Sequence, residues 1–177
     1  GFVSLFISGG LTGIFLGNSA LDIHLHDTYF VIAHFHIVMG VASFFGMFAG
    51  VYHWYPKMFG TYLNNTLAYI HFWVTMVGAY LIFWPMHYEG LAGMPRRYLD
   101  FSGWASFNQF GGLNRFISIV TMIVFAVQLL FVFNFFYSIW KGRKVMTTNP
   151  WGSNTLEWTT PIRPGHGNWP GEIPEVH

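Results

Sequence analysis

Four long apolar segments, separated by more polar stretches, dominate the hydropathy pattern of the chain. They run from Gly1 to about Ala20, from about Thr28 to Trp54, from about Thr66 to Pro85, and from about Leu113 to Trp140. About 20 apolar residues cross the hydrocarbon core of a bilayer, where backbone amides must be satisfied within the segment itself. The weaker alternating pattern of a membrane barrel strand is absent. The pattern therefore predicts an all-α, polytopic membrane helix bundle with about four transmembrane helices.

The stretches between these segments predict the connections and the domain organisation. Leu21–Asp27 reads as a short connection, Tyr55–Asn65 as a second one, and Met86–Gly112 as a long, glycine-rich loop. The end of the chain contains five of the eight prolines, Pro150, Pro161, Pro164, Pro170 and Pro174. We expect a helix bundle over residues 1–145 and an extended, proline-rich, surface-bound tail over residues 146–177. The chain starts inside an apolar run without a signal peptide, so we expect it to be a fragment of a longer protein.

The amino-acid composition is also that of a membrane protein. Only 8% of the residues are charged, while 53% are hydrophobic and 21% aromatic, against roughly 25% charged residues in an ordinary soluble domain. A net charge of +1, with no basic patch, excludes nucleic acid as a partner. The absence of cysteine excludes disulfides, thiolate metal sites, iron–sulfur clusters and c-type haem attachment.

The distribution of basic residues predicts the orientation of the bundle. Lys141, Arg143 and Lys144 directly follow the fourth segment, and the positive-inside rule places them, with the tail, on the cytoplasmic side. Lys57 would then lie inside too. Leu21–Asp27 and the long loop would share the outer side, where the adjacent Arg96 and Arg97 violate the rule. Such a violation predicts an anionic partner for the arginines.

The stretch HDTYFVIAHFH, residues 26–36, carries the candidate chemistry. Ionisable groups at the head of a membrane helix are costly and are functional by default, and the natural partner here is a metal. Residues two apart on an α-helix differ by about 200° around the axis, so His34 and His36 face nearly opposite sides. They cannot readily bind one metal together. We expect each to ligate a different cofactor, with Phe35 between them, since neutral imidazole is a usual axial ligand of haem iron.

An outer polar layer is expected above these ligands. Asp27 precedes His34 by seven residues, which on a continuous helix puts both on one face about 10 Å apart. Haem propionates would point toward this end, and Arg96 and Arg97 could each offer a planar fork to a carboxylate. A divalent ion such as Mg²⁺ would suit Asp27 beside His26.

Several residues also have purely structural explanations that involve no cofactor. The single histidines His53, His71 and His87 are more simply explained as packed or hydrogen-bonded side chains, and His24 as a solvated loop residue. The aromatic residues Phe44, Phe45, Phe48 and Trp54, like Tyr29 and Trp84, fit helix packing and interfacial anchoring. For the whole chain, the alternatives are a non-catalytic electron carrier with bis-histidine haems and a bundle whose histidines only pack.

Several motifs resemble the haem-copper oxidase family, specifically the C-terminal third of cytochrome c oxidase subunit I. They are LDIHLHDTYFVIAHFH at residues 21–36, GGLTG at 9–13, HWYP at 53–56, GLAGMPRRY at 90–98 and NTLEW at 154–158. The resemblance covers nearly the whole chain. It implies that the four segments are helices IX to XII of a twelve-helix subunit.

The resemblance also implies residue roles. His34 would be the proximal ligand of the high-spin haem where oxygen is reduced, and His36 an axial ligand of the low-spin haem. His26 and Asp27 would bind Mg²⁺ or Mn²⁺. Three further residues, Asp22, Arg96 and Arg97, would interact with the haem propionates.

The implied protein is a terminal respiratory oxidase that reduces O2 to water with electrons from cytochrome c, coupled to proton pumping. Its cofactors would be two haems, with haem A as the expected type, and a copper ion (CuB) ligated outside this fragment. Its partners would be subunits II and III, cytochrome c or a cytochrome c domain, and the lipids of a bacterial plasma membrane or mitochondrial inner membrane, with the tail on the cytoplasmic or matrix side. A quinol oxidase of the same superfamily is the nearest alternative.

Overall fold

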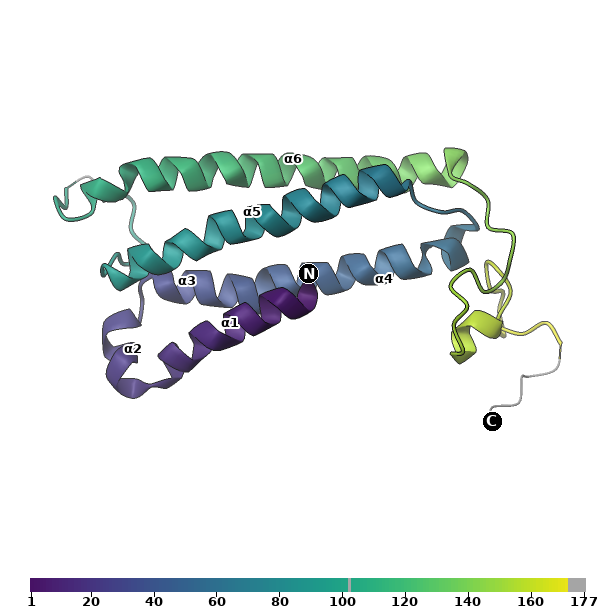
Figure 1. Cartoon of the computed structure of the whole chain (residues 1–177), viewed down its shortest axis with the longest axis horizontal. Coiled ribbons are helices and arrows are strands. Elements are labelled where there is room, and N and C mark those ends of the chain that lie inside the picture. The colour runs from purple at the N-terminus through teal and green to yellow at the C-terminus, as the bar shows by residue number, and fades with distance from the viewer. Residues whose placement is uncertain (102, 172–177) are drawn as a thin grey trace. The chain divides into compact units, whose positions relative to one another are not determined.

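The computed structural model describes residues 1–101 and 103–171, and within these ranges the fold is all-α (Figure 1). The helices are α1 (Phe2–Gly17), α2 (Ser19–Leu25), α3 (Tyr29–Phe35), α4 (Ala42–Phe59), α5 (Asn65–Leu91) and α6 (Gly111–Lys141). Shorter elements are a π-helical turn, η1 (His36–Val41), and two 3₁₀ turns, η2 (Asn108–Phe110) and η3 (Leu156–Thr159). The predicted fold class is confirmed.

Three helical stretches are long and apolar enough to cross a membrane. They are Tyr29–Phe59, Asn65–Leu91 and Asn108–Lys141, the first of which runs through α3, η1 and α4. The pair formed by α1 and α2 passes the same test together but bends by 100° at its break, and counts as a fourth span if the pair is one. The chain is thus an integral membrane protein with three to four candidate spans, in agreement with the sequence.

Two capping residues shift the boundaries expected at the start of the chain. The side chain of Asn18 accepts a hydrogen bond from the Ala20 amide at 3.0 Å, which ends α1 and starts α2. Thr28 caps α3 in the same way by accepting from the Phe30 amide at 3.2 Å. The prediction of a plain connection over Leu21–Asp27 is therefore wrong for most of its length, because α2 continues to Leu25.

Two helices continue beyond the predicted ends of their segments, Trp54 and Pro85, and each contains a proline. Pro85 lies inside α5, which continues to Leu91, and Pro56 lies inside α4, which continues to Phe59. Proline removes one backbone donor, but membrane helices tolerate this because neighbouring groups satisfy the freed carbonyl. The loop predicted to begin at Met86 consequently begins after Leu91.

The chain divides into two compact units, and each is described by itself. The first unit comprises Gly1–Met47 and His71–Gln128. In it, α1 runs beside α3 and η1 (Figure 1). Its main core contains buried residues of α1, η1, α4 and α5, namely Leu5, Ile37, Ala42, Phe45 and Ala79. The histidines of the candidate site, His34 and His36, belong to this unit.

The second unit comprises residues 48–70 and 129–177, of which 172–177 lie outside the described range. The Tyr55 hydroxyl donates to the Phe135 carbonyl at 2.5 Å, joining α4 to α6. Lys57 is buried and donates to the Thr160 carbonyl at 2.5 Å, with its ammonium 5.1 Å from the centre of the Trp158 ring. Lys57 and the tail therefore share one end of this unit, as the orientation argument expected.

Candidate functional site

His34 projects from α3 toward α1. Its Nδ1 lies 3.0 Å from the Thr12 hydroxyl oxygen, and that hydroxyl also lies 2.9 Å from the Gly9 carbonyl oxygen. A carbonyl oxygen can only accept, so the single hydroxyl proton goes to Gly9 and the Thr12 oxygen accepts from Nδ1–H. His34 is thereby held as the tautomer that carries its proton on Nδ1, and Nε2 keeps its lone pair.

His36 is held by a different contact with the same outcome. Its Nδ1 lies 2.8 Å from the Ile32 carbonyl, which fixes the proton on Nδ1 and again leaves the lone pair on Nε2. The ring stacks on Phe83 of α5, with centroids 4.8 Å apart, and on Phe35, with centroids 4.4 Å apart. His36 also opens the π-helical turn η1, a widening of the helix that is frequent at functional sites.

The two imidazoles contact different helices, α1 for His34 and α5 for His36, as the 200° spacing predicted. Both satisfy the chemistry of a haem ligand. Metal-binding histidines almost always donate their second ring N–H to a carbonyl or another acceptor, which fixes the tautomer and raises the basicity of the ligand nitrogen. His34 and His36 would therefore each suit a separate haem, with Nε2 as the ligand atom.

Gly13 provides a further observation on this fit. A Cβ atom at this position would lie 2.9 Å from Cε1 and 3.6 Å from Nε2 of His34. Only glycine lets α1 pass so close to the ring without displacing it. The sequence pattern GGLTG thus supplies both the hydrogen-bond acceptor and the space that the His34 ring uses.

Asp27 and Arg96 are joined by several contacts in the polar layer that the sequence predicted. Arg96 donates through Nε to Asp27 Oδ1 at 2.6 Å, its Nη2 pairs with the same oxygen, and its backbone amide donates to the Asp27 carbonyl at 2.8 Å. The hydrogen bond from Arg96 has the largest effect on the pKa of the Asp27 carboxyl and lowers it below its ordinary value. Burial opposes this in part, and the charges of Arg96, His26 and Arg97 lower the pKa further. The two predicted outer segments are therefore brought together, and Asp27 serves as an anionic partner of Arg96.

The expected helical register between Asp27 and His34 is wrong. Asp27 lies before the Thr28 cap and has a left-handed backbone, with φ +57°, so the 3.6-residue period does not extend to it. Its carboxylate approaches His26 instead, with Oδ2 3.6 Å from Nε2. The other predicted members of the layer are Asp22, whose Oδ2 lies 4.0 Å from His26 Nδ1, and Arg97, which is exposed and has φ +65°.

Few side chains in this layer are available to bind a divalent ion. Across residues 1–101 and 103–171, no three or more His, Asp or Glu side chains come together in an arrangement that could hold a metal. His26 and Asp27 offer two ligands at most. Mg²⁺ commonly binds through one or two carboxylates and keeps several waters, so the pair is compatible with a partly hydrated ion.

The remaining membrane histidines have contacts of their own. His71 is buried in α5 with Nε2 3.0 Å from Gln128 Oε1 of α6. His87 is buried with its ring edge-on to Phe30, 4.8 Å between centroids. In the second unit, His53 packs against Trp151 and Trp158. These contacts suit the packed or hydrogen-bonded interpretation.

Sequence reasoning did not single out Thr12, Gly13, Tyr98 or Glu89. Thr12 and Gly13 lie in a motif that carried the family resemblance but no assigned role. The Tyr98 hydroxyl is hydrogen-bonded with Tyr29, and burial raises its pKa, with further increases from that bond and from the negative charges of Glu89 and Asp100. Glu89 is fully buried in α5, although its segment was expected to be a loop.

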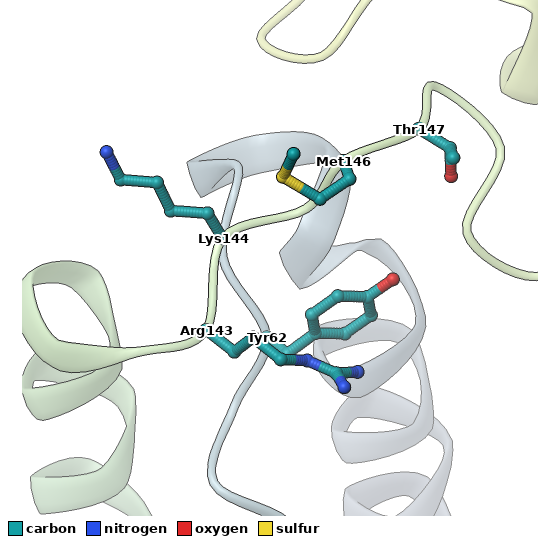
Figure 2. Close-up of a pocket in the computed structure, with 5 residues that line it drawn as sticks. All are labelled: Tyr62, Arg143, Lys144, Met146 and Thr147. Atoms are coloured by element: carbon teal, nitrogen blue, oxygen red, sulfur yellow. The ribbon is translucent and has the colours of Figure 1, made fainter.

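The second unit contains a basic pocket of about 390 Å³, lined by Tyr62, Arg143, Lys144, Met146 and Thr147 (Figure 2). The Arg143 guanidinium lies over the Tyr62 ring, 4.7 Å from its centre, while the Lys144 side chain extends away from that pair (Figure 2). No histidine or carboxylate lines the pocket, which makes it unsuitable as a haem-ligand or metal site.

Comparisons with known proteins identify one family and several relatives that are similar to this chain. The family described as cytochrome C and quinol oxidase polypeptide I matches residues 1–123. The alternative cytochrome c oxidase subunit 1 of Bradyrhizobium diazoefficiens is 51% identical over 100% of this chain and 30% of its own length. Cytochrome c oxidase subunit 1 of Thermostichus vulcanus is 43% identical over 96% of this chain and 30% of its own length. The chain thus spans about 30% of the length of these curated relatives.

Proposed function

Because the chain belongs to the family of cytochrome c and quinol oxidase polypeptide I, we propose that it forms part of the catalytic subunit of a terminal respiratory oxidase. The complete enzyme would reduce O2 to water with electrons from cytochrome c and couple this to proton pumping. The observation that carries the proposal is the pair of imidazoles on one helix, His34 and His36. Each has its Nδ1 proton engaged within the chain, and each contacts a different neighbouring helix.

The family implies haem and copper as cofactors in general. We propose two haems of the A type, of which His34 would hold the high-spin haem and His36 the low-spin haem. The high-spin haem, when bound, supplies the iron at which oxygen is reduced. Phe35 separates the two ligands, and the copper ion CuB would be bound by residues outside this chain.

The chain's own residues would orient these ligands and balance charge. Thr12 and the Ile32 carbonyl fix the histidine tautomers. We propose that Arg96 and Arg97, with Asp22, interact with the haem propionates, and that His26 and Asp27 bind Mg²⁺ or Mn²⁺. Since Arg96 already pairs with Asp27, one arginine would connect the propionate region to the ion.

The assembly and location are proposed on the same basis. Subunits II and III, cytochrome c and membrane lipids would be the partners, in a bacterial plasma membrane or mitochondrial inner membrane. The tail would face the cytoplasm or matrix, as the basic residues after α6 favour. The division into a haem-binding bundle over 1–145 and a tail over 146–177 stays a prediction.

The electron donor is tested on the purified complete complex. Turnover with reduced cytochrome c is expected, and turnover with quinol alone would favour the quinol oxidase that the family description also covers. The carbon monoxide difference spectrum tests catalysis against a bis-histidine carrier. A haem that binds carbon monoxide is expected, whereas two six-coordinate, unreactive haems would contradict the oxidase.

A further inference from the structure

Glu89 is a buried acid that the proposed haem chemistry does not use. It lies in the last turn of α5 with 0% of its surface exposed, and neither carboxyl oxygen has a hydrogen-bond partner among the described residues. The other described acids, Asp22, Asp27, Asp100 and Glu157, are at least partly exposed. An ionised carboxylate without a partner in a low-dielectric site is strongly destabilised, so the neutral acid is the favoured form at rest.

The backbone around Glu89 is fixed. Its carbonyl accepts from the Met94 amide at 3.0 Å, and the Met94 carbonyl in turn accepts from the Tyr29 amide at 3.0 Å. At the next position, a Cβ on Gly90 would meet the backbone of Phe30. The turn after α5 is thus packed against the start of α3, which holds the backbone of the buried Glu89 in place.

Polar side chains lie on the two segments that pack together here, the loop after α5 and the start of α3. Tyr98, in the loop after α5, is hydrogen-bonded through its hydroxyl with Tyr29 of α3. Their rings lie 6.1 Å apart. Arg96 of the same loop binds Asp27, whose side chain is 56% exposed. At the same end of α5, Tyr88 is exposed, while His87 is buried and its Nε2 also has no partner in the described part of the chain.

We propose that Glu89 is a proton-exchange site of the complete oxidase. Its carboxylate binds a proton as an O–H bond forms, and the proton leaves toward the Tyr98–Tyr29 pair when that bond breaks. A leucine or glutamine would fill the same space without the cost of burying an acid, so proton binding is what the carboxyl group adds. This inference rests on the proposed function, because the oxidase reaction consumes and moves protons.

The proposal is tested by infrared difference spectra between the oxidised and the reduced complete complex, recorded once in H2O and once in D2O. Wild type and the exposed control Glu157→Gln should show a protonated-carboxyl carbonyl band that shifts on deuteration, and Glu89→Gln should lack it. Proton release in Glu89→Gln should slow by about 100-fold, the scale of a lost acid–base group. Unchanged carboxyl bands and unchanged proton release in Glu89→Gln would overturn the proposal.

Haem content and the carbon monoxide spectrum separate this result from failure of the proposed function. Glu89→Gln should keep both haems, and a wild-type complex without a carbon monoxide-reactive haem would refute the oxidase itself. Should Glu89→Gln fail to assemble, Glu89→Asp retains a carboxyl group one methylene shorter. A displaced carboxyl band in that variant supports the inference, and an unchanged band overturns it.

Discussion

Thr12→Val isolates the contribution of the Thr12 hydroxyl to the His34 site. Valine has nearly the shape of threonine, so the substitution removes the acceptor of the Nδ1 proton without creating a cavity. Losing such a partner of a metal-binding histidine typically lowers metal affinity by about 10- to 100-fold. At 1.4 kcal/mol per tenfold, this corresponds to about 1.4 to 2.8 kcal/mol.

The assay is the amount of carbon monoxide-reactive haem in the purified complex, together with the iron–histidine stretching frequency from resonance Raman spectroscopy. Both should fall in Thr12→Val, because the unbound Nδ1–H makes the imidazole a weaker ligand. Thr12→Ser keeps the hydroxyl, so its haem content and its stretching frequency should match those of the wild type. Thr121→Val is the matched control, since the Thr121 hydroxyl donates only to the Ile117 carbonyl within α6. A wild-type frequency in Thr12→Val would refute the assigned role of the hydroxyl.

Three further predictions concern stability. Gly90→Ala should destabilise the complex by about 1–3 kcal/mol in thermal unfolding, because the added Cβ overpacks against Phe30 of α3. Gly10→Ala is the control and should not destabilise it, because a Cβ at Gly10 meets nothing within 4 Å. Gln128→Leu removes the hydrogen bonds of Gln128 with His71 and Thr75 of α5 and should lower stability by about 1 kcal/mol in the same assay. Unchanged stability would show that these hydrogen bonds contribute nothing. Because the pKa of Asp27 is lowered, its pairing with Arg96 stabilises the fold fully above about pH 4, and this stabilisation is lost as the pH falls through the lowered pKa. Asp27→Asn should therefore make stability less dependent on pH below about pH 4.

The spans were predictable because the bilayer imposes a simple requirement on length and polarity. The division between His34 and His36 was predictable too, since it depends only on the helical period. The register of Asp27 was not, because one capping residue, Thr28, ends the periodicity that the argument extended across it.

The less visible parts of the site depend on contacts between segments far apart in the sequence. Thr12 lies in an apolar run with no periodic signal, and its importance follows from the approach of α1 to α3. Glu89 lies in the stretch Met86–Gly112, which was predicted to be a glycine-rich loop, whereas α5 continues past Pro85 to Leu91 and Glu89 is buried within it. An acid soon after a proline-interrupted membrane segment would have been the signal to seek.

The central claim is tested most directly by measuring the high-spin and low-spin haem content of complete complexes that carry His34→Ala or His36→Ala. The account predicts that His34→Ala loses the carbon monoxide-reactive high-spin haem and keeps the low-spin haem, and that His36→Ala does the reverse. Loss of the same haem in both variants, or of neither, would contradict the assignment of the two histidines to two different haems.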